Sequence, residues 1–365
     1  MFRRQTRLIV TCVAILLSSL TAFAAEPPSP FQLRDTAIID EPRGAAYIAK
    51  PNGTIDAVDL AAGRTLWNSD DAALPLGVGD DLLVAQFEEK PAGERLRIVV
   101  IDTASGSKVS EATIPLPDGA RALVSDELGK KFRATAEREG ATFLITWYYQ
   151  SLAVRGDARE KEEDEREEAG SFAGSVRIQA RSGKVLASSG GPVTDVPARW
   201  RMHGAPPQQP WHANGRSVRS EGGRGGPLVL KRTESASGRP LPEQAVSNRA
   251  LVHVASFDQR HLLVTERVGD GGPDDPEYRW QVFAMDTGER ATELRRDVSA
   301  TPFFVFGDSI VLISPPHAYR NGDTLVEVPL KLEAFRLSTS VAKWNVELRD
   351  LTYRGRMPLR RAKKR

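Results

Sequence analysis

The five histidines are the first candidates for metal binding or acid–base chemistry. A metal site needs at least three converging ligands, each held in place by further hydrogen bonds. No His-x-His or His-x-x-x-His spacing occurs in the chain. We therefore expect packing or surface roles for the histidines, and no metal site. They are His203, His212, His253, His261 and His317.

An acidic loop, Asp270 to Glu277 (DGGPDDPE), offers several oxygen ligands. Calcium takes about six to eight oxygens from carboxylates and carbonyls. The loop lacks the length and spacing of a helix-loop-helix calcium site. Its glycines and prolines are typical of a turn, so we interpret it as the tip of a hairpin between two strands.

Nucleophilic and phosphate-binding motifs are missing from the sequence. There is no Gly-x-Ser-x-Gly elbow and no Gly-x4-Gly-Lys-Ser/Thr loop. The glycine-rich run 222–226 (GGRGG) precedes Pro227 and an expected strand, whereas phosphate loops lead into a helix. We interpret this run as a linker and predict no catalytic residue.

The segment 196–226 combines arginines, tryptophans and prolines, and no regular pattern is evident in it. Long irregular insertions often carry recognition, and Arg and Trp are enriched in binding hot spots. We therefore predict an insertion loop at 196–226, with a linker between repeats as the alternative. Its candidate partner-binding residues are Arg199, Trp200, Arg201 and Trp211.

Two further segments are strongly charged. The segment 156–170 contains DAREKEEDEREE, which predicts a solvated helix or a disordered insertion loop, with an acidic docking surface as the alternative. The C-terminal tail, 353–365, carries seven bases and no acid. We expect a disordered end. Weak contact with an anionic membrane surface is the alternative.

The elements that would position these residues are indicated by an internal repeat. The sequence AVDLAAGRTLW, residues 57–67, returns as AFRLSTSVAKW, residues 334–344. Four weaker copies lie between these two, at residues 100–106, 178–185, 230–238 and 283–288. Such an echo predicts a chain built from stacked β units.

Each copy reads as a strand, a tight turn and a second strand. An aspartate ending the first strand can accept backbone N–H groups, and glycine supplies the positive φ of the turn. In the fifth copy the aspartate is retained and the turn appears shortened; in the sixth, Arg336 and Ser340 replace the Asp and the Gly. The predicted structural positions are Asp59, Gly63, Trp67, Asp102, Gly106, Gly183, Gly238, Asp286, Gly288 and Trp344.

The spacing of the copies predicts the fold class. A further strand or strand pair precedes most copies, and the turn residues 63, 106, 183, 238, 288 and 340 recur mostly at blade-like intervals. One longer gap, from 106 to 183, is expected to hold an insertion, with a hidden blade as the alternative. We predict an all-β fold over 31–352: an antiparallel β-propeller of six to seven four-stranded blades.

The ends of the chain indicate export. Arg3, Arg4 and Arg7 precede an apolar run, Leu8 to Leu20, and a small-residue cleavage site. We predict a Sec-type signal peptide over 1–24 and no transmembrane segment in the mature chain. The apolar run is too short to span a bilayer as a helix, and an N-terminal membrane anchor is the alternative. Its removal would take the net charge from +2 to −1 (2 − 3), which argues against nucleic-acid binding.

The pattern Ala-x-Asp-x-x-x-Gly-x-x-x-Trp resembles the repeat of the quinoprotein-like (PQQ-like repeat) β-propellers. The enzymes of this family hold a quinone at the propeller centre with calcium and an aspartate base, and many have a pair of adjacent cysteines above it. The only cysteine here, Cys12, lies in the predicted signal, and no matching Asp or Glu constellation stands beside an Asn. The chain is similar to the non-catalytic members, which implies no cofactor.

These observations favour a non-catalytic scaffold of the cell envelope that binds a protein or glycan, and a periplasmic or secreted location. The alternative is a reduced PQQ-dependent alcohol or sugar dehydrogenase, with PQQ and calcium as cofactors. The same repeat serves enzymes and scaffolds, so the fold alone does not decide between them.

Overall fold

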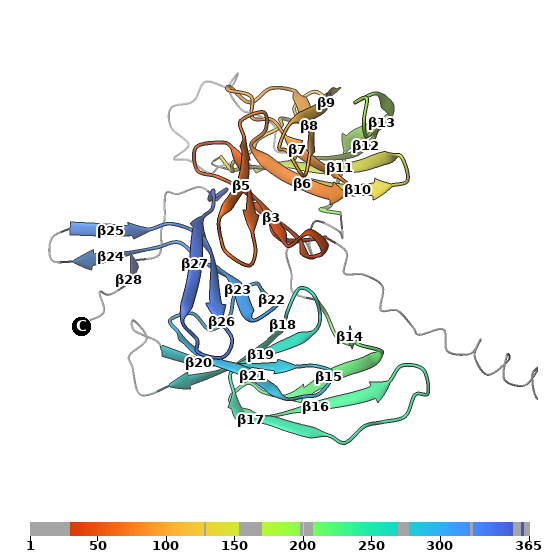
Figure 1. Ribbon diagram of the computed structural model, residues 1–365. Helices are drawn as coiled ribbons and strands as arrows, with labels where there is room; N and C mark the ends of the chain where they lie inside the picture. Colours follow the sequence, from red (N-terminus) through yellow and green to blue (C-terminus); the bar gives the residue numbers. More distant parts are fainter. Residues whose placement is uncertain are drawn as a thin grey trace, which may run out of the picture.

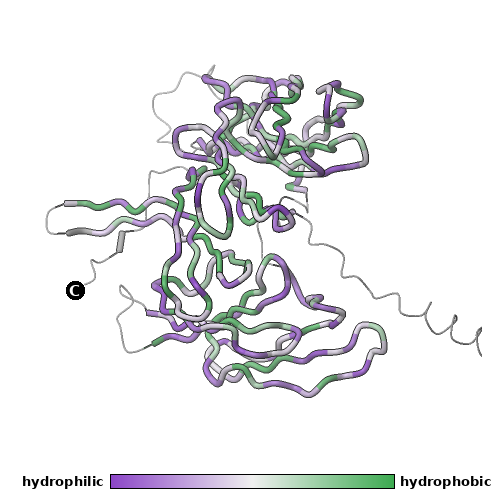
Figure 2. The backbone as a smooth tube through the Cα atoms, viewed as in Figure 1, coloured by the Kyte–Doolittle hydropathy of each residue, from purple (hydrophilic) through white to green (hydrophobic). Residues whose placement is uncertain are grey.

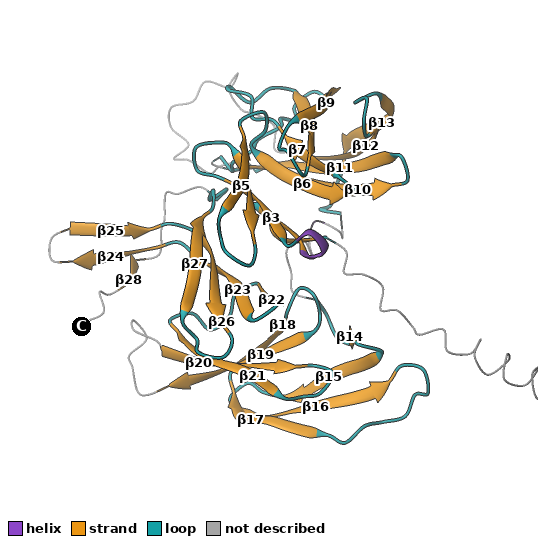
Figure 3. Ribbon diagram, viewed as in Figure 1, coloured by secondary structure: helices purple, strands orange, loops and turns teal. Residues whose placement is uncertain are grey.

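The computed structural model describes residues 30–127, 129–152, 170–197, 200, 207–268, 277–321, 324–352 and 359–360. Strands make up most of this part, with one short 3₁₀ helix, η1 (Glu41–Arg43) (Figure 3). The predicted signal peptide and nearly all of the predicted insertion 156–170, the acidic loop and the basic tail lie outside the described residues. Within the described part, no helix has the length and apolarity needed to cross a membrane.

The first three sheets follow one another along the chain (Figure 1). The first consists of β1 (Phe31–Arg34), β2 (Ala37–Asp40), β3 (Ala45–Ala49), β4 (Ile55–Asp59) and β5 (Thr65–Ser69). The second consists of β6 (Leu74–Gly79), β7 (Leu82–Gln86), β8 (Arg95–Asp102) and β9 (Lys108–Pro115). The third consists of β10 (Lys130–Glu139), β11 (Thr142–Ser151), β12 (Gly170–Gln179) and β13 (Val185–Pro192).

The remaining three large sheets continue the same order. The fourth consists of β14 (Trp211–Ala213), β15 (Arg216–Gly222), β16 (Gly226–Glu234) and β17 (Gln244–Ala250). The fifth consists of β18 (Val252–Ala255), β19 (His261–Val268), β20 (Glu277–Ala284) and β21 (Arg290–Arg296). The sixth consists of β22 (Phe303–Phe306), β23 (Ser309–Ser314), β26 (Lys331–Arg336) and β27 (Ala342–Glu347).

A small sheet extends from the sixth. Its hairpin, β24 (His317–Asn321) and β25 (Thr324–Val328), interrupts the sixth sheet and projects outward (Figure 1). A short strand near the C-terminus, β28 (Leu359–Arg360), pairs parallel with β24. At least these two residues of the predicted tail are therefore in a sheet.

The six large sheets confirm the predicted fold class, an antiparallel β-propeller, with six blades. Strands that follow one another in each blade pair antiparallel, except where the hairpin interrupts the sixth. The long gap between residues 106 and 183 holds β9 and one blade, the third, whose connection from β11 to β12 contains the insertion. The described residues in that gap form no further blade.

The predicted irregular segment 196–226 is a partial error, because residues 211–226 contain β14, β15 and the start of β16. Asn214 and Gly215 both have positive φ, 46° and 72°, and form the tight hairpin turn between β14 and β15. The glycine-rich run 222–226, interpreted as a linker, is the next hairpin turn. Three of its glycines have positive φ, namely Gly222, Gly223 and Gly225.

The repeat turn has the same backbone bonding in all six blades. The first turn residue donates its N–H to the carbonyl five residues later, and the fifth residue donates back to the first. The fifth residue has positive φ in every copy and is glycine except for Ser340. The first residues are Asp59, Asp102, Gln179, Glu234, Ala284 and Arg336.

This bonding corrects the prediction for the fifth copy. Ala284, not Asp286, occupies the first turn position, since Gly288 donates to the Ala284 carbonyl. The turn is therefore not shortened. Asp286 lies two residues further on, where it accepts from Asn214 Nδ2 at 2.6 Å and so links the fifth blade to the fourth.

Neighbouring blades are joined by a repeated side-chain bond. The donor is the side chain of the residue eight positions after the first turn residue of one blade. The acceptor is the backbone carbonyl of the second turn residue in the next blade. Four such bonds occur: Trp67 Nε1 to Thr103 O at 2.8 Å, Ser110 Oγ to Ala180 O at 3.0 Å, Thr292 Oγ1 to Leu337 O at 2.6 Å, and Trp344 Nε1 to Leu60 O at 3.2 Å. The last bond joins the sixth blade to the first.

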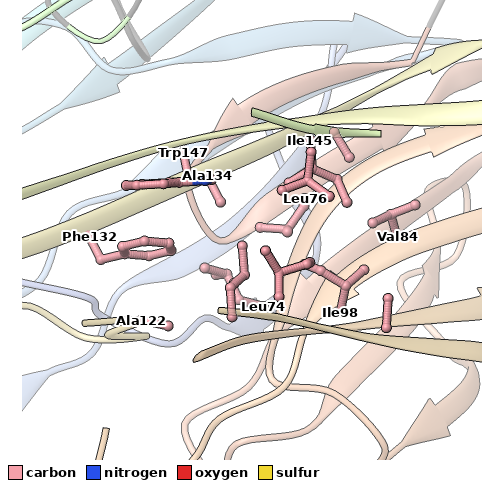
Figure 4. Close-up of a cluster of buried hydrophobic side chains, with 14 of the residues drawn as sticks. Leu74, Leu76, Val84, Ile98, Ala122, Phe132, Ala134, Ile145 and Trp147 are labelled. Carbon is pink, nitrogen blue, oxygen red and sulfur yellow. The ribbon is translucent and has the colours of Figure 1, made fainter. Parts of the chain in front are cut away.

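Apolar clusters fill the same interfaces. Figure 4 shows the cluster between the second and third blades, with Leu76, Ile98 and Trp147 among its members. Similar clusters lie between the first and second, fourth and fifth, fifth and sixth, and sixth and first blades. Figure 2 shows the corresponding pattern, with apolar stretches inside strands and hydrophilic residues at many hairpin ends.

The centre of the arc of blades is occupied by β1 and the turn that follows it. Phe31 packs against Phe257 of the fifth blade and Phe304 of the sixth. In the turn, Asp35 forms an ion pair with Arg133 of the third blade, with Oδ2 and Nε 2.6 Å apart. The innermost strand thus braces the first blade against three others.

Candidate functional site

The third and fourth blades lack the link that joins other neighbouring blades. The position equivalent to Trp67 and Trp344 is Ala187 in the third blade, whose side chain has no hydrogen-bond donor. None of the five apolar clusters formed by described residues contains side chains of both the third and the fourth blade. In Figure 1 the first and sixth blades adjoin, whereas β13 and β14 lie apart on the other side.

The fourth blade also lacks the usual donor, because the equivalent residue is Pro242. Here other bonds replace it. Gln244 Nε2 donates to Gly288 O at 2.6 Å, and Arg232 Nη1 donates to Asp286 O at 3.0 Å. The fourth and fifth blades are therefore joined, and among the residues that the structure describes only the third and fourth blades lack both a link of this kind and a shared apolar cluster.

The third blade has a serine where every other blade has a large buried side chain. Four residues before the first turn residue, this blade has Ser175, which is partly exposed. The other five residues are all fully buried and pack against the following blade. They are Ile55, Ile98, Leu230, Trp280 and Leu332. The face of the third blade that points to the fourth is thus polar by sequence.

Four hydroxyl side chains form a row across this outward face. Thr135, Thr146, Ser175 and Ser189 are paired in register across β10, β11, β12 and β13. The two hydroxyls of the first pair are 3.1 Å apart, and those of Ser175 and Ser189 are 3.0 Å apart. Neighbouring strands lie about 4.8 Å apart, so the row extends about 14 Å across the blade.

One aromatic pair lies beside the hydroxyl row. Tyr148 is two residues from Thr146 and therefore on the same face of β11. Trp200 stacks on it, with ring centroids 6.5 Å apart and planes at 22°. Tyr148 is 3% exposed and Trp200 is half-buried. The predicted candidate Trp200 thus lies over the outward face of the third blade.

Of the other predicted candidates, only Trp211 is described, and it does not lie with Trp200. Trp211 is only 3% exposed, donates Nε1 to Pro207 O at 2.8 Å, and packs in the apolar cluster between the fourth and fifth blades. Its position in a strand of alternating burial makes it a core residue. Arg199 and Arg201 lie outside the described residues.

Two arginines on the outward face of the third blade have carboxylate partners. Arg177 Nη2 lies 2.5 Å from Glu139 Oε2. Arg133 is paired with Asp35 and, through both terminal nitrogens, with Asp126. Burial acts to lower the pKa of Arg133, but the hydrogen bonds and charges of these two aspartates outweigh burial and raise it. Both cations are therefore compensated.

The facing side of the fourth blade carries a different kind of polarity. Lys231 Nζ lies 2.8 Å from Glu221 Oε2 and 3.3 Å from Glu243 Oε1. His212, next to Trp211 in sequence, is exposed. This side is therefore charged, and its exposed ion pairs contribute little to stability.

The centre of the arc does not suit a flat quinone, the cofactor that the resemblance associates with this place. Phe31, Leu33 and Phe304 pack there. Glu41 and Arg260 also meet across the arc, at 2.8 Å between Oε2 and Nη2. Burial raises the pKa of Glu41 despite the opposing effect of Arg260. We assign no quinone chemistry to these residues.

No metal site emerges from the described residues, where no group of three His, Cys, Asp or Glu side chains could hold an ion. Burial lowers the pKa of both His253 and His261, which favours neutral imidazoles. His317 is half-buried in β24, and His203 is outside the described part.

The hydroxyl row could not be found from the sequence motifs. It depends on the register of four strands, two of which are separated by the insertion between β11 and β12. One signal was present in the sequence. Aligning the six copies by their turns places Ser175 against five large apolar residues.

Comparisons of sequence give no relative. No protein-family model matches the chain, and no curated protein matches it.

Comparisons of structure give several propellers. BamB from Moraxella catarrhalis is 13% identical, covers 87% of this chain and 76% of its own, and has a TM-score of 0.23. A quinohemoprotein alcohol dehydrogenase from Comamonas testosteroni is 9% identical, with 88% and 68% coverage and a TM-score of 0.30. The β-propeller domain of Cps50 (Swd1) from Myceliophteria thermophila is 8% identical, with 90% and 91% coverage and a TM-score of 0.28. The likeness is one of fold.

Proposed function

We propose that this chain is an exported, non-catalytic β-propeller that binds a protein or glycan partner of the cell envelope. The partner would bind at the outward face of the third blade. A single observation carries the proposal: Ser175 and its row of hydroxyls replace the apolar surface that seals five other blade faces. A face meant to pack on a neighbour would be apolar.

The surroundings of this face support a binding role. The outer strand of the third blade, β13, is exposed along nearly its whole length. Trp200, the one predicted recognition residue that is described and accessible, lies over the same face. Aromatic residues such as Trp are enriched in protein interfaces relative to the rest of the surface.

Site-specific photo-crosslinking in cells tests this role. A photoreactive residue at Ser189 should capture an envelope component, whereas one at Thr65, an exposed position on the outer strand of the first blade, should not. Thr65 is the matched control because both positions lie on outermost strands. Equal capture at the two positions, or none at Ser189, would contradict the proposed binding face.

Export is tested separately. A chain lacking residues 1–24 should remain in the cytoplasm, and the full chain should be recovered, shortened, from the periplasm or the medium. Recovery of an uncleaved full chain in the cytoplasm would contradict the proposed envelope location. The binding face would then be tested by the crosslinking experiment alone.

A further inference from the structure

We infer that the outward face of the third blade binds an extended, uncharged glycan chain. This inference rests on the proposed binding function and names its ligand class. The carrying features are the hydroxyl row Thr135, Thr146, Ser175 and Ser189 and the Tyr148–Trp200 stack beside it.

The hydroxyl row supplies hydrogen-bonding capacity in the form that sugars use. Each hydroxyl has one donor and two acceptor lone pairs. In each of the two observed hydroxyl pairs, one O–H donates to the other hydroxyl. The second O–H of the pair and several oxygen lone pairs are not used within the row. A ligand whose own hydroxyls both donate and accept can use the free O–H groups and the free lone pairs of the row, whereas an acceptor-only anion can use only the O–H groups.

The aromatic stack supplies the second component of sugar recognition. One face of Trp200 rests on Tyr148, and the ring stays half-buried rather than enclosed. An aromatic ring adds apolar contact area and a favourable contact with C–H groups beyond simple burial. Pyranose rings present such C–H groups on the faces that their hydroxyls leave free.

The electrostatics favour an uncharged ligand. Arg133 and Arg177 already have carboxylate partners. On the same face of β10, Lys131 and Glu137 carry opposite charges. Among the described residues, the two arginines of this face are thus paired with carboxylates, and the small side chains of Ala173, Ser175 and Ser189 keep the face flat enough for an extended chain.

A glycan co-sedimentation experiment tests the inference. The full exported chain is incubated with cellulose, chitin and protease-treated peptidoglycan sacculi as three protein-free probes. We expect binding to at least one of them. Trp200→Ala should weaken it about tenfold, as the loss of one aromatic contact would. Ser189→Arg, which adds bulk and charge to an exposed position, should abolish it.

Two controls separate binding from folding. Tyr319→Ala removes a half-buried aromatic from the projecting hairpin, and Thr65→Val removes an exposed hydroxyl from β5. Both should leave glycan binding unchanged. Ser189 is exposed, so Ser189→Arg should leave the fold intact. It therefore tests binding even where Trp200→Ala lowers the melting temperature.

The outcomes distinguish this inference from the proposed function. Failure of the wild-type chain to bind all three glycans, or binding indifferent to Trp200→Ala and Ser189→Arg, overturns the glycan inference. If photo-crosslinking at Ser189 then still captures an envelope protein, the proposed function stands with a protein as its partner. If neither assay depends on this face, both are wrong.

Discussion

Two blade boundaries in this molecule have opposite character. Between the sixth and first blades, Trp344 packs on Gly63, donates to Leu60 O, and lies in a large apolar cluster. Between the third and fourth, the equivalent of Trp344 is Ala187, and the equivalent of the buried Leu332 is Ser175. The same repeat therefore builds a sealed boundary or an open one according to the residues at two positions.

The largest expected effect comes from breaking the sealed boundary. Trp344→Ala removes the ring that joins the sixth blade to the first, and should lower the free energy of unfolding by about 3 to 5 kcal/mol. Urea denaturation followed by intrinsic fluorescence measures it. Leu66→Ala, at an exposed position of β5, is the control and should change stability little. Equal effects of the two would show that Trp344 does not hold the boundary.

A pair of glycine substitutions separates packing from backbone strain. Gly63 and Gly238 occupy the same turn position with φ of 70° and 67°. A Cβ on Gly63 would lie 2.2 Å from Trp344 Cγ, whereas nothing lies within 4 Å of a Cβ on Gly238. Gly238→Ala should cost about 1 to 2 kcal/mol from the positive φ alone. Gly63→Ala should cost about 1 to 3 kcal/mol more, and chemical denaturation of both variants measures the difference. Similar losses would argue against the close Trp344 contact.

The hydroxyl links should have moderate effects. Thr292→Val removes the bond to Leu337 O and keeps the shape of the side chain, so it should cost about 1 kcal/mol. Ala187→Thr adds a hydroxyl at the equivalent position of the open boundary and should change stability by less than about 0.5 kcal/mol. Thermal denaturation of both variants is the measurement. A marked gain for Ala187→Thr would indicate a boundary that closes.

The smallest expected effect concerns pH. Backbone N–H groups of Ala62 and Ala61 donate to Asp59 and lower its pKa. A lowered carboxyl pKa stabilises the fold above the ordinary value of about 4, and this contribution is lost as pH falls through the folded pKa. Between pH 6 and 3, Asp59→Ala should therefore lose less stability than the wild type. Gln179→Ala, at the equivalent position of the third blade, where the first turn residue is uncharged, should keep the wild-type slope.

Much of the scaffold was predictable because its signals are local. A turn that needs positive φ at its fifth residue shows as Gly63, Gly106, Gly183, Gly238 and Gly288 in the sequence. The hairpin at Asn214–Gly215 is equally local, but the arginines and prolines around it are also typical of an irregular loop. In the fifth copy, the aspartate Asp286 suggests a turn that begins two residues after its true first residue, Ala284.

The candidate site was less predictable because it depends on distant pairing. Trp200 was identified by residue type, yet its neighbour Tyr148 lies on a strand about fifty residues earlier in the chain. Trp211 has the same residue type and a buried, structural position. Composition alone does not separate the two; the burial of the strand on which each residue lies does.

Native-state cysteine labelling at one repeat position tests the open boundary most directly. In a Cys12→Ser background, Ser175→Cys and Ile98→Cys place a thiol at the same position of the third and second blades. We predict that maleimide modifies Ser175→Cys in the folded protein and modifies Ile98→Cys only after unfolding. Equal protection of the two thiols would show that the third blade is covered like the others, and would contradict the account.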